Sequence, residues 1–166
     1  SELYMLEELQ LFKNKITGIE DNCLQGLINL KYLDLHNNLL EELQSIPHSD
    51  KLDTIILGYN RINKINNLTN CINLTVLDVN NNKLESVPIQ VLQLNNLKTL
   101  NLQNNSINDI PAELCLLKYL VRLNIEGNPL RKLSNKVRTG NAEQIKSYLK
   151  TRLSFDPNEI NNDASE

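Results

Sequence analysis

The chain has 166 residues, of which 40% are hydrophobic but only 4% aromatic, and it contains no tryptophan. A net charge of −3 and an isoelectric point near 5.5 disfavour a nucleic-acid binder, because phosphate binding calls for a basic surface. Three widely spaced cysteines do not form a disulfide framework, and neither a run of about 18 apolar residues nor an apolar leader is found. These features predict one domain without a membrane span, in the reducing cytoplasm.

One pattern recurs from the amino end to about residue 130. It carries an aliphatic residue at positions 1, 4, 6 and 11 and asparagine at position 9. The copies are LEELQLFKNKI (6–16), LKYLDLHNNLL (30–40), LDTIILGYNRI (52–62), LTVLDVNNNKL (74–84), LKTLNLQNNSI (97–107) and LVRLNIEGNPL (120–130). Their asparagines lie 22 to 24 residues apart. This spacing is typical of leucine-rich repeats.

Each copy predicts a short strand followed by a turn. Aliphatic residues two apart, such as Leu33 and Leu35, lie on one face of a strand, and successive strands stack about 4.8 Å apart in a parallel sheet. The asparagine at position 9, such as Asn82, follows the strand and can hydrogen-bond backbone groups of its own and adjacent coils. Asn80 and Asn81 are expected to face solvent on the inner curve. The fold class is therefore α/β, a solenoid with a parallel sheet on its concave face.

The segments that return the chain along the convex side differ in composition. Residues 87–97 and 110–120 combine a proline with apolar residues at helical spacing, which predicts one or two helical turns. Residues 65–74 are richer in asparagine, which predicts an irregular or 3₁₀ return. Cys71 and Cys115 lie at apolar positions of these returns. We interpret them as core residues, with reactive or metal-binding thiols as the alternative.

The two ends of the chain differ. Residues 141–153 predict an amphipathic helix with Asn141 as its N-cap, which would cover the last coil and complete a repeat domain over residues 1–153. Residues 154–166 are expected to form a disordered acidic tail. Residues 3–5 cover little of the first coil, so either the chain belongs to a longer repeat array or a neighbour associates with this uncapped amino-terminal edge.

Two further patterns have a structural and a functional interpretation. Asn-x-Ser/Thr strings begin at Asn67, Asn73 and Asn104, and we attribute them to composition rather than glycosylation. A basic cluster could bind phosphoinositide or RNA phosphates, but we favour a solvated surface of the cap. The cluster consists of Arg131, Lys132, Lys136, Arg138, Lys146, Lys150 and Arg152.

The carboxyl-terminal coils carry a family resemblance. The strings LTVLDVNNNKLESVP (74–88), EGNPLRKL (126–133) and GNAEQIKSYLKTRL (140–153) resemble the intracellular leucine-rich repeat proteins, in particular the carboxyl-terminal end of leucine-rich repeat-containing protein 40 and the Ras-group-related plant repeats. NRINKINNLTNCINLTVLDV (60–79) resembles the 22-residue repeats of protein phosphatase 1 regulatory subunits. The likeness covers residues 6–153. It implies binding to proteins without catalytic chemistry.

The residues themselves do not favour an enzyme. The best constellation is Asp34 with His36 on one strand and Asp78 two strands away, but Thr54 is the nearest nucleophile on that face. No phosphate-binding glycine loop and no metal-ligand spacing occur, so no cofactor and no metal is expected.

The concave face is the predicted binding surface for a protein partner of unknown identity. Its expected members are Tyr32, Asp34, His36, Thr54, Ile56, Tyr59, Val76, Asp78, Asn80, Asn101 and Arg122. Ile56 is aliphatic where its counterparts are polar, which indicates an interface hot spot or the general strand preference of β-branched residues. The predicted function is an adaptor or scaffold. The alternative is a regulatory subunit of an enzyme such as protein phosphatase 1.

Overall fold

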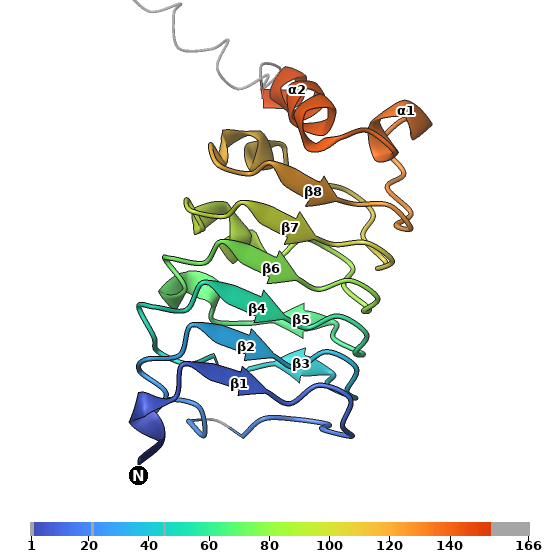
Figure 1. Ribbon diagram of the computed structural model, residues 1–166. Coiled ribbons are helices and arrows are strands. Elements are labelled where there is room, and N and C mark those ends of the chain that lie inside the picture. The colour runs from blue at the N-terminus through green and yellow to red at the C-terminus, as the bar shows by residue number, and fades with distance from the viewer. Residues whose placement is uncertain (1, 21, 45, 154–166) are drawn as a thin grey trace, which may run out of the picture.

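The protein is a curved stack of coils in the computed structural model, which describes residues 2–20, 22–44 and 46–153 (Figure 1). One six-stranded parallel sheet runs through the stack in the order β1-β2-β4-β6-β7-β8. Its strands are β1 (Glu8–Gln10), β2 (Tyr32–Asp34), β4 (Thr54–Ile56), β6 (Val76–Asp78), β7 (Thr99–Asn101) and β8 (Arg122–Asn124). The register pairs equivalent repeat positions, as in Leu33 with Ile55 and Leu77 with Leu100. The predicted parallel sheet is confirmed.

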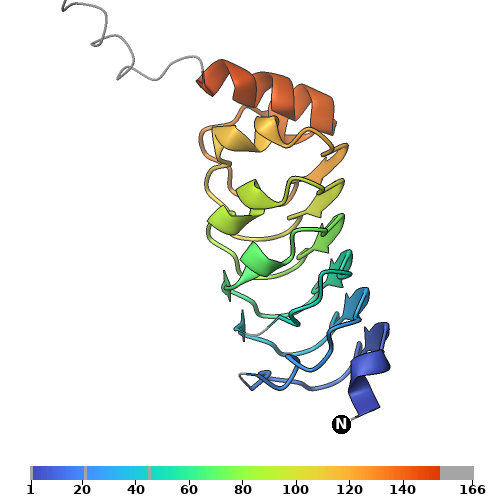
Figure 2. The same cartoon turned by 90° about the vertical axis from the view of Figure 1, so that its left-hand side faces the viewer.

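A second, smaller sheet was not anticipated from the sequence. It consists of the parallel strands β3 (Glu42–Leu43) and β5 (Lys64–Ile65). It lies on the wall of the stack opposite the main sheet (Figure 2). Leu43 and Ile65 are buried in the core, so this sheet closes the second and third coils on their convex side.

A 3₁₀ return is one of the two forms expected for residues 65–74, and one or two helical turns are expected for residues 87–97 and 110–120. The returns of the third, fourth and fifth coils contain 3₁₀ helices. These are η2 (Leu68–Asn70), η3 (Ile89–Gln93) and η4 (Ala112–Leu116), and a further one, η1 (Glu2–Met5), precedes β1. Pro88 and Pro111 stand directly before η3 and η4. The helices η2, η3 and η4 have three to five residues each, which suits the short 3₁₀ form.

The asparagines at position 9 connect neighbouring coils. Asn82 Nδ2 donates to the carbonyl oxygens of Leu57 (3.0 Å) and Val79 (3.1 Å), while its Oδ1 accepts the N–H of Ile62 at 2.8 Å. The same three bonds recur at Asn38, Asn60, Asn105 and Asn128. The predicted structural role of this position is therefore confirmed.

The residue before each of these asparagines has a left-handed backbone. The φ angles are positive at Lys13, Asn37, Tyr59, Asn81, Asn104 and Gly127. Asn81 is half-exposed rather than freely solvated, and its φ of 50° is one that asparagine tolerates better than most residues. Position 8 thus has a conformational requirement that the sequence analysis did not include.

The carboxyl end is covered by α2 (Ala142–Leu153), which follows a short helix, α1 (Asn135–Arg138). Asn141 Oδ1 accepts the N–H of Gln144 at 2.9 Å, and Gln144 Oε1 accepts the N–H of Asn141 at 3.0 Å, which is a reciprocal capping box. Ile145 and Leu149 are fully buried against the last coil. The predicted capping helix is present with its expected N-cap.

Part of the basic cluster is structural rather than solvated, which corrects that interpretation. Lys146 Nζ donates to the carbonyl oxygens of Leu117 (2.7 Å) and Leu120 (3.3 Å), both at the end of the η4 return. Arg138 Nη2 donates to the carbonyl oxygen of Leu130 at 2.7 Å, and Arg152 pairs with Asp109. These cations satisfy acceptors of the last coils, so the chain itself uses part of their binding capacity.

The amino-terminal edge is open, as expected. Leu9, Leu11, Ile16 and Ile19 are only half-buried, and the side chain of Met5 in η1 is 66% exposed. The predicted tail, residues 154–166, lies outside the described residues. No helix in the described part of the chain is long and apolar enough to cross a membrane.

Candidate functional site

The inner face of the six-stranded sheet, here called the concave face, displays three rows of side chains. Figure 2 shows the strands along the shorter side of the curved stack. Position 3 contributes Glu8, Tyr32, Thr54, Val76, Thr99 and Arg122. Position 5 contributes Gln10, Asp34, Ile56, Asp78, Asn101 and Asn124. Position 7, just beyond the strands, contributes Phe12, His36, Gly58, Asn80, Gln103 and Glu126.

Asp34 is buried, which corrects the expectation that it is displayed with its neighbours. The residue is 6% exposed, because its Oδ1 accepts the backbone N–H of His36 (3.0 Å) and lies 2.7 Å from Nδ1 of the same residue. Tyr32 adds a long contact of 3.4 Å from its hydroxyl to Oδ2. Burial, and then the negative charge of Asp34, raises the pKa of Tyr32. Asp34 therefore contributes negative charge to this face, and among the described residues its Oδ2 has only the long contact with Tyr32.

Phe12 is a member of the face that the sequence analysis missed. Its ring stacks on the His36 imidazole, with centroids 4.9 Å apart and planes within 6°. Phe12 and His36 occupy position 7 of adjacent coils, so the repeat register contained the signal. One face of the His36 ring is therefore covered by Phe12 of the first coil.

Asp78 is half-exposed, and its carboxylate is fixed at both oxygens. Oδ1 accepts the N–H of Asn80 at 3.0 Å, and Oδ2 accepts from Asn101 Nδ2 at 3.0 Å. The Asn80 side chain lies over Gly58 of the preceding coil, so closely that a Cβ at residue 58 would overlap its Oδ1. The carboxamide of Asn80 thus takes the space that a side chain at 58 would fill.

Ile56 lies between two aspartates in the sheet. The register pairs its Cα with Asp34 on one side and with Asp78 on the other. Thr54 and Val76 are half-buried neighbours at position 3. In β2, β6 and β7 the position-5 side chain accepts the N–H two residues later, which the hydrocarbon side chain of Ile56 does not do. Ile56 therefore replaces a recurrent hydrogen bond with apolar surface.

The remaining predicted residues lie toward the margins of the face. Tyr59 follows β4 at a left-handed position, with φ of 57° and a side chain 55% exposed. Arg122 is exposed on the last strand, β8. The predicted residues therefore lie on one surface, in which Asp34 is buried and Tyr59 is exposed at the margin.

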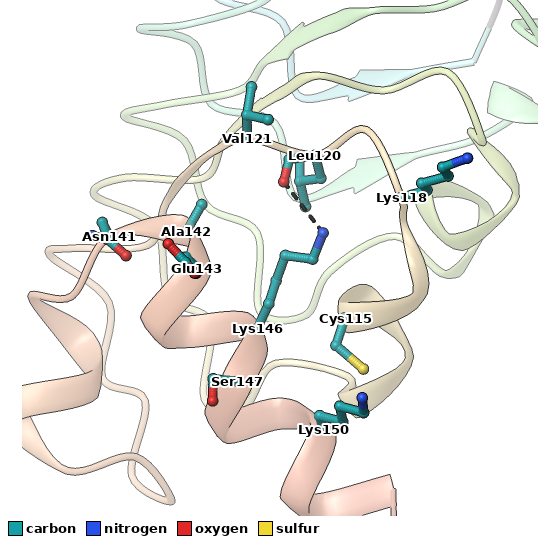
Figure 3. Close-up of a pocket in the computed structure, with 10 residues that line it drawn as sticks. All are labelled: Cys115, Lys118, Leu120, Val121, Asn141, Ala142, Glu143, Lys146, Ser147 and Lys150. Carbon is teal, nitrogen blue, oxygen red and sulfur yellow. Dashed lines mark hydrogen bonds between the residues drawn. The ribbon is translucent and has the colours of Figure 1, made fainter.

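A separate groove of about 690 Å³ lies between α2 and the η4 return (Figure 3). Cys115, Val121 and Lys146 are among its lining residues, and the Lys146 amine points to the Leu120 carbonyl oxygen. Cys115 is half-buried, so its expected core role is incomplete, whereas Cys71 is buried and its pKa is raised to about 11 by burial. The described residues contain no group of three or more His, Cys, Asp or Glu that could hold a metal.

The sequence matches the family described as leucine rich repeat over residues 5–62 and 72–130. Human keratocan is 42% identical over 83 residues, which cover 48% of this chain and 23% of keratocan. Bovine osteomodulin is 36% identical over 89 residues, which cover 51% of this chain and 21% of osteomodulin. The chain thus spans about a quarter or less of the length of these relatives.

Two solved structures share the fold. A leucine-rich repeat protein of Leptospira interrogans superposes with a TM-score of 0.73 at 30% identity, over 91% of this chain and 37% of that one. The plant peptide hormone receptor RGFR1, solved in complex with RGF2, gives a TM-score of 0.61 at 31% identity, over 74% of this chain and 21% of the receptor.

These relatives overturn one expectation. Keratocan and osteomodulin are secreted proteins of the extracellular matrix, which contradicts the cytoplasmic localisation predicted from the cysteines and the missing leader. Unpaired cysteines and the start of a sequence are weak guides to a compartment. The general family resemblance is supported, whereas its intracellular branch is not.

Proposed function

The chain belongs to the leucine-rich repeat family, and from this premise we propose that it is a non-catalytic module that binds a protein partner on its concave face. Proteins of this family are generally interaction modules, and the similar receptor RGFR1 was solved in complex with RGF2. The observation that carries the proposal is Ile56, an aliphatic side chain on an otherwise polar row of a fully formed sheet.

The polar side chains of the face are already fixed by the protein. The side chains of Asp78 and Asn101 hydrogen-bond each other and the adjoining backbone, and the Asn80 side chain accepts a hydrogen bond from the Asn81 side chain. The side chains of this surface are therefore already ordered before a partner binds. Binding would cost little side-chain entropy, which favours affinity. A small apolar centre surrounded by polar groups is also the usual form of an interface hot spot.

The test compares partner recovery by two double variants of the chain. Ile56→Asp with Tyr59→Ala alters the concave face, whereas Ile89→Asp with Tyr119→Ala makes the same changes outside it. Ile89 and Tyr119 are 64% and 49% exposed, so both pairs lie at accessible positions. We expect the first variant to lose a partner captured by the unaltered chain and the second to retain it. Equal recovery by two folded variants would reject the concave face as the binding surface.

The same capture decides between a scaffold and a regulatory subunit. Recovery of a phosphatase catalytic subunit that depends on Ile56 and Tyr59 would assign the regulatory role. Recovery of a partner without enzymatic activity would assign the scaffold role. Both outcomes preserve binding on the concave face.

A second interaction surface is favoured by the exposed apolar residues of the amino-terminal edge. Leu3, Tyr4 and Met5 are each more than half exposed beside the unpaired side of β1. We propose that this edge associates with another polypeptide. Replacement of Leu3 and Met5 by serine should then reduce self-association or partner recovery in sedimentation velocity and capture experiments, and unchanged behaviour in both would reject this surface.

A further inference from the structure

The charges around Ile56 indicate what kind of partner group it would contact. The surrounding side chains, here called the Ile56 patch, are Tyr32, Asp34, Thr54, Ile56, Val76 and Asp78. They form two rows of three on adjacent strands, with apolar or hydroxyl side chains in one row and carboxylates flanking Ile56 in the other. The patch therefore combines an apolar floor with negative charge on both sides.

Neither aspartate is neutralised by a cation of the chain. Within residues 2–20, 22–44 and 46–153, no lysine or arginine forms an ion pair with Asp34 or Asp78. Asp34 contacts His36 and, at 3.4 Å, the hydroxyl of Tyr32, and the interaction with His36 also exists with a neutral imidazole. By contrast, Asp109, which is half-exposed like Asp78, is paired with both Arg152 and Lys132.

The negative charge is not required by the local fold. Asp34 and Asp78 each accept the N–H two residues later, at 3.0 Å. Asn101 makes the same contact to the N–H of Gln103 at 3.3 Å with a neutral carboxamide. An asparagine would therefore also accept the N–H at the strand end, so this contact does not require the negative charge of the two carboxylates.

The geometry does not favour one shared metal ion as the ligand. Asp34 and Asp78 lie two strands apart, which places them about 10 Å from each other. Each carboxylate is instead held at its own strand end by the N–H two residues later, and the described residues contain no group of three or more His, Cys, Asp or Glu that could hold a metal ion. A lysine or arginine side chain fits this arrangement instead, because its aliphatic stem can lie on Ile56 while its charged head reaches a neighbouring carboxylate.

We propose that the concave face recognises a lysine or arginine side chain on an extended segment of a partner protein. The methylene stem lies on Ile56 and Val76, and the charged head hydrogen-bonds the half-exposed carboxylate of Asp78. Asp34 strengthens the negative potential from the opposite side. This assignment rests on the proposed function and specifies the chemistry of the partner at that surface.

The test uses two peptides that differ in one charge. Acetyl-Ser-Val-Arg-Val-Ser-amide is titrated into the isotope-labelled full chain, and backbone amide shifts are followed by NMR. The matched peptide carries citrulline, a neutral analogue of arginine of nearly the same shape. We expect saturable shifts at Thr54, Ile56 and Asp78 with the arginine peptide, and a dissociation constant about tenfold higher with citrulline.

A charge-swapped variant provides the matched protein control. Asp78→Asn with Asn101→Asp keeps the net charge and the bond between the two side chains. It also keeps an acceptor for the N–H of Asn80 and of Gln103, but moves the carboxylate one strand farther from Ile56. We expect the arginine peptide to bind this variant about tenfold more weakly while the melting temperature is unchanged.

The outcomes separate this inference from the proposed function. Equal binding of both peptides on the concave face would overturn the basic specificity and leave protein binding there intact. Absence of shifts at the patch, or full affinity for the charge-swapped variant, would also overturn the inference. The proposed function itself is tested separately, by partner capture with the variant that carries Ile56→Asp and Tyr59→Ala.

Discussion

The guanidinium of Arg152 donates two hydrogen bonds of 2.9 Å to the carboxylate of Asp109, although the residues are 43 positions apart. Arg152 belongs to the last turn of α2, and Asp109 follows the fifth repeat. Both side chains are slightly more than a quarter exposed. The pair therefore fixes the end of the capping helix to the return that contains η4.

Replacement of Asp109 by asparagine should destabilise the chain in a pH-dependent way. Burial alone would raise the pKa of Asp109, but hydrogen bonds from Arg152 and Lys132 and from the Ile110 N–H outweigh it and lower the pKa. The resulting stability is present above the unfolded pKa of about 3.9 and is lost as pH falls through the lower folded value. We expect Asp109→Asn to reduce the free energy of unfolding by about 1 kcal/mol at neutral pH.

Urea unfolding from neutral pH to about pH 2 measures this difference. It should shrink as the pH falls, and a constant difference would contradict the role of the charge. Glu7→Gln is the control, because the pair of Glu7 with Lys31 is exposed and its loss should leave the unfolding midpoint unchanged.

The asparagines at position 9 should be stability determinants. Asn82→Ala or Asn105→Ala removes the partners of two carbonyl groups and one N–H at a buried turn, at a cost of about 1 to 3 kcal/mol each. Asn95→Ala is the control, since Asn95 is exposed and its change should stay within about 0.5 kcal/mol. Equal losses at Asn82 and Asn95 in chemical denaturation would refute this role.

Tyr59 should be a residue at which stability and binding conflict. Its left-handed φ of 57° is unfavourable for a bulky side chain and acceptable for asparagine. Three of the six coils have asparagine at the equivalent place, namely Asn37, Asn81 and Asn104. We expect Tyr59→Asn to raise the free energy of unfolding by about 0.5 to 1 kcal/mol and to weaken partner binding. Tyr119→Asn, at an exposed tyrosine without positive φ, should give neither effect. A less stable Tyr59→Asn chain would reject the strain argument.

The capping helix should be required for cooperative unfolding. A chain that ends at Gly140 exposes the apolar surface covered by Ile145 and Leu149 and is expected to aggregate or to melt over a broad range. A chain that ends at Asp156 should melt as the full chain does. The point variant Ile145→Ala should cost about 2 to 5 kcal/mol, because Ile145 is fully buried. Sharp, unshifted melting of the chain that ends at Gly140 would rule out a capping role.

Cys71 should resist alkylation in the folded chain. Burial raises its pKa to about 11, so at about pH 8 its thiol is protonated as well as inaccessible. The stability linked to this protonated thiol is fully present below the unfolded pKa of about 8.5 and is lost as pH rises toward about 11. Mass spectrometry after iodoacetamide treatment should show modification at the exposed Cys23 first and at Cys71 only in denaturant. Rapid labelling of Cys71 without denaturant would contradict its core position.

The repeat pattern by itself determined the architecture of the protein. Aliphatic residues at fixed spacing place the strands, the asparagine at position 9 satisfies backbone groups between coils, and Asn141 begins the capping helix. These features depend on local chemistry repeated along the chain and on contacts between adjacent coils. They could therefore be predicted from Leu33, Asn82 and their counterparts without knowledge of the whole molecule.

Only the tertiary structure decided which concave residues are buried and which are exposed. Asp34 and Asp78 occupy the same repeat position, yet Asp34 is buried by His36 and Tyr32 whereas Asp78 stays half-exposed beside Asn101. The pairing of Arg152 with Asp109 was likewise not predictable, because it joins residues from different structural units. Burial and ion pairing depend on which side chains meet across coils, and a linear pattern does not contain that information.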